Sequence, residues 1–228
     1  MLNVSKEENI RRIIAMEDRI SRCQRCISLA PCKIKPSLGR GELIPDIIMV
    51  FESESSFTSD SKAIISLRKL IKEELGFSNI YHTYMVRCQP KACVLRQNLD
   101  FYTDSSYNNA KLMDKNQNCL LSGKDCSGIP IKPSDEEILL CLPYLLEEIE
   151  ILRPDYIFLF GKRVIDYISK SCGFFLEADE ADYFNKENIT YFCTCNEEDF
   201  GKTECNRLKN HFLNSKKSNH NLLPKKNS

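Results

Sequence analysis

Two unbroken apolar stretches constrain the fold of this chain more than any other feature. The first lies at the end of the segment Pro45–Phe51. The second lies within the segment Pro154–Gly161, directly before the closing glycine. Strands with no polar face are buried on both sides, which is the usual condition of parallel strands covered by helices. The two segments therefore predict the centre of a parallel sheet.

The regions around these stretches supply the other elements. Apolar residues recur at helical spacing in several segments, and two further segments have the β-branched and aromatic content of strands. We expect helices at about Glu7–Cys26, Ser61–Leu75, Pro133–Ile149, Lys162–Lys170 and Glu204–Leu213, and strands at about Ile80–Cys88 and Ile189–Cys195. A strand, a helix and a strand in succession form a parallel unit with a right-handed crossover. The predicted fold class is therefore α/β, a three-layer α/β/α sandwich with a central, mostly parallel four-stranded sheet.

We expect one domain over residues 1–213. Between residues 94 and 132 the periodicity is lost and Asn, Ser, Asp, Gly and Lys dominate, which predicts a polar, partly disordered insertion. Residues 214–228 are expected to form a basic flexible tail.

Composition limits the cellular location and the binding partners that we expect for this protein. No apolar run approaches the ~20 residues of a membrane helix, and the N-terminal residues lack the apolar core of a signal peptide. We therefore expect a cytoplasmic monomer that does not bind membranes. The formal net charge is zero, so any binding of DNA has to rely on a local basic patch.

The chain has 12 cysteines, more than packing needs. In a reducing compartment such a count favours metal binding over disulfides, and a secreted disulfide protein is the alternative. Cys23 and Cys26 form a Cys-x-x-Cys pair at the end of a predicted helix, Cys88 ends a predicted strand, and Cys141 lies on a predicted helix. We expect these four thiols to share one centre beside a crevice, either an iron–sulfur cluster or a structural zinc ion.

The order of these pieces resembles the iron–sulfur uracil-DNA glycosylases, the family-four type of the uracil-DNA glycosylase superfamily. That family begins with a Cys-x-x-Cys helix and a glycine pair, followed by an apolar strand that ends in Gly-Glu. A strand that ends in a Lys-Cys-Arg-Pro-like motif and a helix with Glu-Ile-x-x-Cys-x-x-Tyr-Leu come next. The matching segments here are Cys23–Cys26, Gly39–Gly41, Ile47–Glu52, Arg87–Pro90, Glu137–Leu145 and Pro154–Gly161. The resemblance covers about Ile10–Ile168, interrupted by the insertion.

The resemblance implies a uracil-DNA glycosylase-like fold and a [4Fe–4S] cluster held by Cys23, Cys26, Cys88 and Cys141, with zinc as the alternative. Four soft thiolates suit such a cluster on chemical grounds as well. The other cysteines fall into two groups. Candidates to replace a ligand are Cys32, Cys93, Cys119 and Cys126, and those expected to be small buried hydrophobes are Cys172, Cys193, Cys195 and Cys205.

The same resemblance implies a base-excision repair enzyme that hydrolyses the N-glycosidic bond of a flipped, deaminated base. Glu52 stands at the acid of the family's Gly-Glu-Ala-Pro-Gly loop and is the candidate catalytic residue, although Glu54 can serve equally. The alternative for Glu52 is an N-cap or a loop acid at the next helix. Phe57 is the candidate for the aromatic that stacks on the base. Tyr84 replaces the base-reading Asn of the family, and Asn196 stands about where its His-Pro-Ser loop is expected.

Contacts with DNA are expected around the same crevice. Gly39, Arg40 and Gly41 form a loop whose glycines permit close approach to a phosphate or a base. Arg87 and Lys91 flank the crevice with Arg40 and are expected to face phosphates. A plain turn is the alternative for the glycines, and a solvated surface is the alternative for the cations.

Three functions stay open on the sequence alone. The first is a DNA glycosylase, and the second is a catalytically impaired [4Fe–4S] protein that binds DNA or assists repair. The third is a zinc-stabilised interaction module with no role on nucleic acid. His82, which alternates along a predicted strand, is expected to be a packed or surface residue and not a catalytic one.

Overall fold

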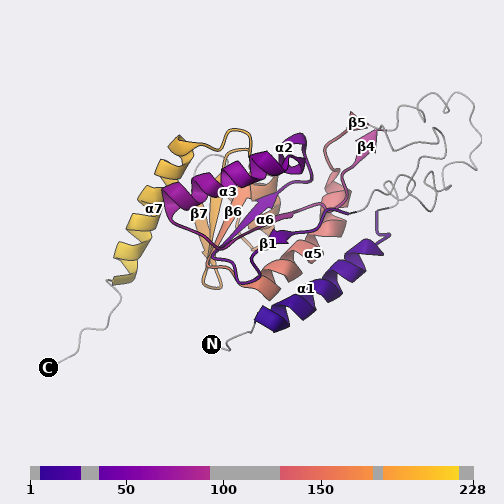
Figure 1. The fold of residues 1–228 in the computed structure, drawn as a ribbon, viewed down its shortest axis with the longest axis horizontal. Coiled ribbons are helices and arrows are strands. Elements are labelled where there is room, and N and C mark those ends of the chain that lie inside the picture. The colour runs from indigo at the N-terminus through magenta and orange to yellow at the C-terminus, as the bar shows by residue number, and fades with distance from the viewer. Residues whose placement is uncertain (1–5, 27–35, 93–128, 177–181, 221–228) are drawn as a thin grey trace, which may run out of the picture.

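The computed structural model describes residues 6–26, 36–92, 129–176 and 182–220 of the chain. Its centre is a six-stranded sheet with the strand order β1-β3-β2-β6-β8-β7 (Figure 1). The strands are β1 (Arg40–Gly41), β2 (Ile47–Phe51), β3 (Ile80–Tyr84), β6 (Tyr156–Phe160), β7 (Tyr183–Lys186) and β8 (Ile189–Thr194). Strands β2, β3, β6 and β8 are parallel, whereas β1 and β7 pair antiparallel at the two edges. The four predicted parallel strands are confirmed, with two edge strands added.

Helices cover both faces of this sheet. They are α1 (Lys6–Ser21), α2 (Ser56–Ser59), α3 (Ser61–Leu75), α5 (Asp135–Leu152), α6 (Lys162–Ser171) and α7 (Lys202–His220). Buried side chains of α1, α5 and α6 form one core with one face of the sheet, and those of α3 and α7 form a second core with the other face. The predicted three layers are therefore confirmed. In the described part of the chain, no helix is both long enough and apolar enough to cross a membrane.

Alternation along β2 explains its unbroken apolar run. Ile48 and Val50 belong to the core under α1 and α5, whereas Ile47, Met49 and Phe51 belong to the core under α3 and α7. All five side chains are fully buried. Because both faces of this central strand are covered, neither face tolerates polar side chains.

The order of connections places a crevice at the C-terminal ends of β2 and β6. From β2 the chain crosses through α3 to β3, and it later returns through α5 to β6 on the other side of β2. Connections that leave in opposite directions open a gap between the ends of adjacent parallel strands, where open α/β sheets bind their ligands. Glu52 and Gly161, the first residues after β2 and β6, lie at the edges of this gap.

Several boundaries differ from the sequence-based expectation. Strand β3 ends at Tyr84, so Cys88 lies in the segment after it and not at the end of a strand. Helix α1 ends at Ser21, so Cys23 and Cys26 lie in the segment after it. Helix α7 continues to His220, so residues 214–220 of the predicted flexible tail are helical. The predicted insertion contains a strand, β5 (Ile129–Pro130), which pairs with β4 (Lys91–Ala92). The remainder of the predicted insertion up to residue 128, and the tail from residue 221, lie outside the described residues.

Candidate functional site

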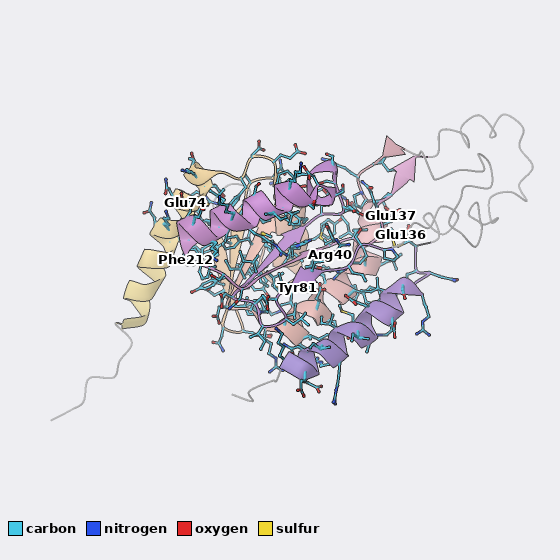
Figure 2. The ribbon with its side chains drawn as sticks, viewed as in Figure 1. Arg40, Glu74, Tyr81, Glu136, Glu137 and Phe212 are labelled. Atoms are coloured by element: carbon cyan, nitrogen blue, oxygen red, sulfur yellow. The ribbon has the colours of Figure 1, made fainter. Side chains whose placement is uncertain are left out.

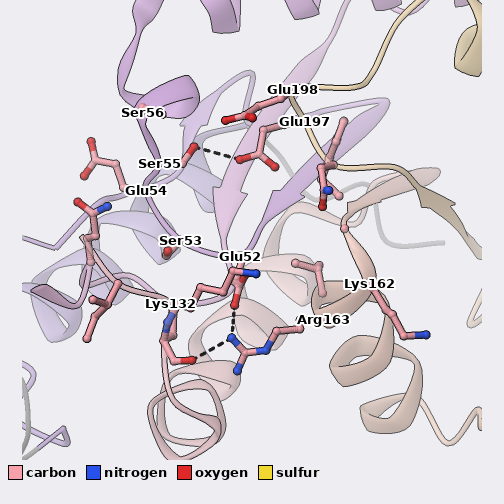
Figure 3. A pocket seen from close by; sticks show the side chains of 17 residues that line it. Glu52, Ser53, Glu54, Ser55, Ser56, Lys132, Lys162, Arg163, Glu197 and Glu198 are labelled. Atoms are coloured by element: carbon pink, nitrogen blue, oxygen red, sulfur yellow. Dashed lines mark hydrogen bonds and ion pairs between the residues drawn. The ribbon is translucent and has the colours of Figure 1, made fainter. Parts of the chain in front are cut away.

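A crevice of about 640 Å³ opens at the ends of β2, β6 and β8. Its walls are the loop after β2, the first turn of α6, the segment before α5 and the loop after β8 (Figure 3). The charged residues that line it are Glu52, Glu54, Glu197, Glu198, Lys132, Lys162 and Arg163. Its volume is in the range of sites for small molecules. The lining has more carboxylates than cations.

Glu52 follows β2 directly and is held in an ion pair. Its Oε1 accepts a hydrogen bond from Nη1 of Arg163 (Figure 3). The two side chains are 25% and 30% exposed, so water screens the pair only in part. The caps of helices α2 and α3 are Ser55 and Asp60, so the alternative that Glu52 is an N-cap is wrong.

Arg163 links three segments around the crevice. Its Nη1 also donates to the carbonyl oxygen of Pro133 at 2.9 Å, and its Nη2 donates to Oδ1 of Asp135 at 2.8 Å. Burial opposes the guanidinium charge, but the hydrogen bond with Asp135 and the nearby Glu52 outweigh it and raise the pKa of Arg163. Arg163 is not among the residues predicted from the sequence. The sequence indicates it only by position, because it lies in the first turn of the helix that follows the glycine after β6.

Asn196 lines the same crevice from the loop after β8. Gly161 has a φ of 86°, and a Cβ atom placed on it would lie 2.7 Å from Oδ1 of Asn196. A side chain at position 161 would therefore be strained and would also displace the amide. The loop after β8 is tied to the loop after β2, because Oγ of Ser55 donates to Oε1 of Glu197 at 3.0 Å. The fold thus brings two predicted site residues, Glu52 and Asn196, to one crevice.

The two predicted aromatic residues lie outside this crevice. Phe57 in α2 is half-buried and packs against the core under α3. Tyr84 is 4% exposed, and its ring centroid lies 6.2 Å from that of Phe51 and 6.0 Å from that of His82. Neither Phe57 nor Tyr84 lines the crevice, so a base bound there would not stack on either of them as they stand.

A second hollow, of about 610 Å³, lies beside β1 and β3 and shares Glu54 with the crevice. Tyr84, Arg40, Arg68 and His82 are among its lining residues. Nη2 of Arg68 lies 2.6 Å from Nδ1 of His82. Burial and the charges of Arg68 and Arg40 lower the pKa of His82 to about 4. The imidazole is therefore neutral and accepts this hydrogen bond, and the prediction of a packed histidine is confirmed.

The predicted glycine pair lies against the sheet. Strand β1 pairs with β3, with Gly41 opposite Tyr81, and Arg40 lies on the same edge (Figure 2). A Cβ atom on Gly39 would lie 2.6 Å from Oε1 of Glu148, and one on Gly41 would lie 2.7 Å from Cα of Tyr81. The close approach that these glycines permit is therefore made to β3 and to α5. A contact of this loop with DNA stays a prediction.

Arg87 is buried, so the predicted phosphate contact of this residue is wrong. Its side chain is 1% exposed, and its Nη2 donates to Oε2 of Glu148 at 2.5 Å. Burial opposes its charge, but Glu148 outweighs burial and raises the pKa of Arg87. Glu148 is not among the predicted site residues, and its sequence signal is an acid within the apolar pattern of α5. Lys91 belongs to β4, and its contact with DNA stays a prediction.

The four predicted cysteine ligands line one small pocket. Cys23 and Cys26 follow α1, Cys88 follows β3, and Cys141 lies in α5. The empty space of this pocket, open solvent included, is about 330 Å³. None of these four cysteines forms a disulfide. The fold thus brings distant thiols together, whereas their binding of a metal stays a prediction.

Contacts with α5 hold the Cys-x-x-Cys segment in place. The guanidinium carbon of Arg25 lies 4.6 Å from the ring centroid of Tyr144, and Nη1 of Arg25 donates to the carbonyl oxygen of Leu140 at 3.3 Å. Burial and a hydrogen bond with Cys23 raise the pKa of Tyr144. Ile20, in the last turn of α1, is buried and also lines the pocket. The segment is thereby anchored before the first thiol and between the two thiols.

Two thiols of this pocket, those of Cys26 and Cys141, resist ionisation in the absence of a cation. Burial and the neighbouring Cys141 and Cys23 raise the pKa of Cys26 to about 11, and burial raises the pKa of Cys141. A bound metal removes such thiol protons outright. Among the described residues, no group of three or more His, Cys, Asp or Glu side chains is set to hold a metal ion.

Of the remaining cysteines, four lie within the described residues and four lie outside them. Cys193 and Cys205 are buried, and Cys172 and Cys195 are partly buried against the two cores. The prediction of small buried hydrophobes is therefore confirmed for Cys193 and Cys205, whereas Cys172 and Cys195 are only partly buried. The candidate substitute ligands Cys32, Cys93, Cys119 and Cys126 lie outside the described residues.

Comparison with known families assigns the fold. A model of the uracil DNA glycosylase superfamily matches residues 52–213. The matched residues include Glu52, Cys88, Cys141 and Asn196, whereas the Cys-x-x-Cys pair precedes them. A search of curated proteins finds no match to the chain. Because the matched residues make up well over half of the chain, and the central sheet with helices on both faces agrees with them, this chain belongs to the uracil-DNA glycosylase superfamily.

Proposed function

We propose that this protein is an iron–sulfur DNA glycosylase that hydrolyses the N-glycosidic bond of a deaminated base during base-excision repair. The superfamily to which it belongs acts on DNA. The observation that carries the proposal is the crevice that Glu52, at the end of β2, shares with Asn196, in the loop after β8. The pocket lined by four cysteines supports the iron–sulfur assignment.

The reaction places defined demands on this crevice. Water attacks C1′ of the flipped nucleotide while the bond from C1′ to the base nitrogen breaks, and the bonding electron pair leaves with the base. The carboxylate of Glu52 orients the water and accepts its proton, or stabilises the positive charge that develops on the sugar. The amide of Asn196 can donate a hydrogen bond to the negative charge on the departing base.

Arg163 prepares Glu52 for this role. The guanidinium is fixed by the carbonyl oxygen of Pro133 and by Asp135, and it holds the Glu52 carboxylate from one side. A side chain that is oriented before the substrate binds lowers the entropic cost of the reaction. We therefore assign Arg163 as a positioning residue.

Cys23, Cys26, Cys88 and Cys141 are the residues that would hold the [4Fe–4S] cluster. When bound, the cluster would cross-link the segment after α1 to the end of β3 and to α5, through the thiolate set that such clusters use. Zinc is the alternative, and it needs each sulfur about 2.3 Å from one point.

A second function, binding of DNA without catalysis, is favoured by the lining of the crevice. Four glutamates face three cations there, and one of these cations, Arg163, is already paired with Glu52 and Asp135. Tyr84, at the position where the family reads the base, is buried and outside the crevice. Both observations fit a protein that keeps the fold and has lost the base pocket.

Release of free base from oligonucleotides that contain one uracil or one hypoxanthine separates the two functions. We expect the wild-type protein to release base, and Glu52→Gln to slow release by about 10²–10⁴-fold, the usual loss on removal of a general base. Glu198→Gln is the matched control, because it neutralises another carboxylate of the same crevice. Glu54→Gln tests the neighbouring acid.

Two results would contradict the proposal in different ways. Normal base release by Glu52→Gln would remove the catalytic role of this carboxylate. Binding of both oligonucleotides by the wild-type protein without release of either base would favour the second function.

A further inference from the structure

Arg87 carries two hydrogen-bond donors that no described residue accepts. Its Nε and Nη1 atoms are buried without a partner in the part of the chain that the structure describes. The side chain is 1% exposed. A buried donor without an acceptor is costly, and more so when it belongs to a charged group. The two nitrogen atoms are therefore available to an acceptor of a bound group.

Glu148 does not satisfy these donors. Its Oε1 accepts a hydrogen bond from the hydroxyl of Tyr81 at 2.8 Å, and its Oε2 accepts from Oγ1 of Thr83 and from Nη2 of Arg87, both at 2.5 Å. The carboxylate is also 1% exposed. This network occupies one of the three guanidinium nitrogens of Arg87 and both oxygens of Glu148.

Arg87 also lines the pocket of the four cysteines. Its backbone N–H donates to Sγ of Cys141 at 3.3 Å, and Cys88 is the next residue in the chain. The second cation that lines this pocket, Arg25, is exposed, so water screens its charge. The buried positive charge beside the cysteine sulfurs is therefore that of Arg87.

We propose that Arg87 is the internal counter-ion of the metal centre held by the four cysteines, a proposal that rests on the proposed existence of that centre. Four thiolates carry more negative charge than the core of a [4Fe–4S] cluster or a zinc ion carries positive charge, so either centre is an anion. A guanidinium in the low-dielectric interior stabilises such an anion strongly. Arg87 then lies between two anions, with Glu148 on one side and the metal centre on the other.

The proposed role of Arg87 depends on its charge and not on its packing. Arg87 is a positioning residue that retains the centre without ligating it, and Glu148 limits that effect because it competes for the same guanidinium. Loss of Arg87 and loss of Glu148 must therefore act on the centre in opposite directions. A pair that served only the packing of β3 on α5 would respond to both losses in the same way.

The test compares metal release and reduction potential in four proteins purified without oxygen: wild type, Arg87→Gln, Glu148→Gln and the double variant. The rate at which iron or zinc passes to an added chelator is the first measurement. For an iron centre, the midpoint potential in a titration with dithionite, which adds one electron to the centre, is the second. The double variant leaves no unpaired buried charge, so it keeps the test available if Arg87→Gln alone does not fold.

We expect Arg87→Gln to release metal about tenfold faster than wild type, because a charge-assisted contact has been lost, and the double variant to release it faster than Glu148→Gln. Glu148→Gln should release it no faster than wild type. The midpoint potential should fall in Arg87→Gln and rise in Glu148→Gln, since the reduced centre carries one more negative charge.

Failure of this inference and failure of the proposed function are separate results. Equal release from wild type and Arg87→Gln, or faster release from both single variants, would overturn the role of Arg87 while leaving the centre intact. A wild-type protein without bound iron or zinc would overturn the proposed centre and this inference with it.

Discussion

His82 is a neutral imidazole that the fold keeps from protonation. It is 5% exposed in β3, and its pKa is lowered to about 4 by burial and by the charges of Arg68 and Arg40. An unfolded histidine has a pKa of about 6.5. Between these two values the unfolded chain binds a proton that the folded chain does not, so stability falls as the pH is lowered through this window.

Replacement of His82 by Gln should remove this pH dependence, because Gln has no titrating group. As the pH falls from about 6.5 to about 4, the wild-type protein should lose up to roughly 3 kcal/mol of free energy of unfolding that His82→Gln retains. Urea unfolding of both proteins across this range measures the difference. An equal loss in the two proteins would show that His82 protonates freely in the folded state.

For a single residue, a role could be predicted from the sequence where it depends on the position of that residue next to a strand. Glu52 comes directly after an apolar strand, and strand order alone places it at the mouth of the crevice. Arg87 has the same kind of position after β3, but its partner Glu148 lies 61 residues further along the chain. Nothing in the local sequence shows that α5 brings a carboxylate there, so the buried role of Arg87 could not be predicted.

At the scale of elements, the packing of α1 on α5 positions two of the four cysteines. Ile20 is 1% exposed in the last turn of α1 and lines the cysteine pocket, three residues before Cys23. Ile14 lies on the same helix but is 54% exposed. Substitutions at these two positions therefore distinguish the contribution of helix packing to stability from that of the helix itself.

Ile20→Ala should lower the free energy of unfolding by about 2–5 kcal/mol, because it leaves a cavity where the helix meets the pocket. Ile14→Ala should change it by no more than about 0.5 kcal/mol, as exposed substitutions do. Chemical denaturation gives both values, and metal content should fall only in Ile20→Ala. Equal effects of the two substitutions would contradict the packing described for α1.

The main elements could be predicted because their patterns are long and regular. The four parallel strands and most of the helices have clear apolar periods, whereas the two edge strands do not. Strand β1 has only two residues, and β7 is joined to β8 by Glu187 and Asn188, whose φ angles are 51° and 67°. Such turns usually carry Asn-Gly or Asp-Gly, so this hairpin gives no recognisable signal.

At the scale of the whole molecule, balanced charge limits how DNA can be bound. The formal net charge is zero, and the crevice has three cations, one of them paired with Glu52 and Asp135. Few phosphates can therefore be neutralised at this site. The architecture was predictable from the alternation of strands and helices. The balance of charge in the crevice was not, because the crevice gathers side chains from four separate segments.

The affinity for DNA should depend weakly on salt. Two or three phosphate contacts give a slope of log K against log salt concentration of about −2 to −3 for duplex DNA. Fluorescence anisotropy with a labelled duplex across a salt series measures this slope, and Lys162→Ala should make it shallower by about 1. A slope several units steeper would place the DNA on a basic surface other than the crevice.

The central claim is that four cysteines from distant segments hold one iron–sulfur cluster beside the crevice. The most direct measurement is the iron and acid-labile sulfide content of protein purified without oxygen, together with its visible absorbance. We predict about four iron and four sulfide atoms per chain and a brown protein, all lost when Cys88 and Cys141 are replaced by Ala. Stoichiometric zinc with no sulfide, or a colourless protein without metal, would contradict the claim.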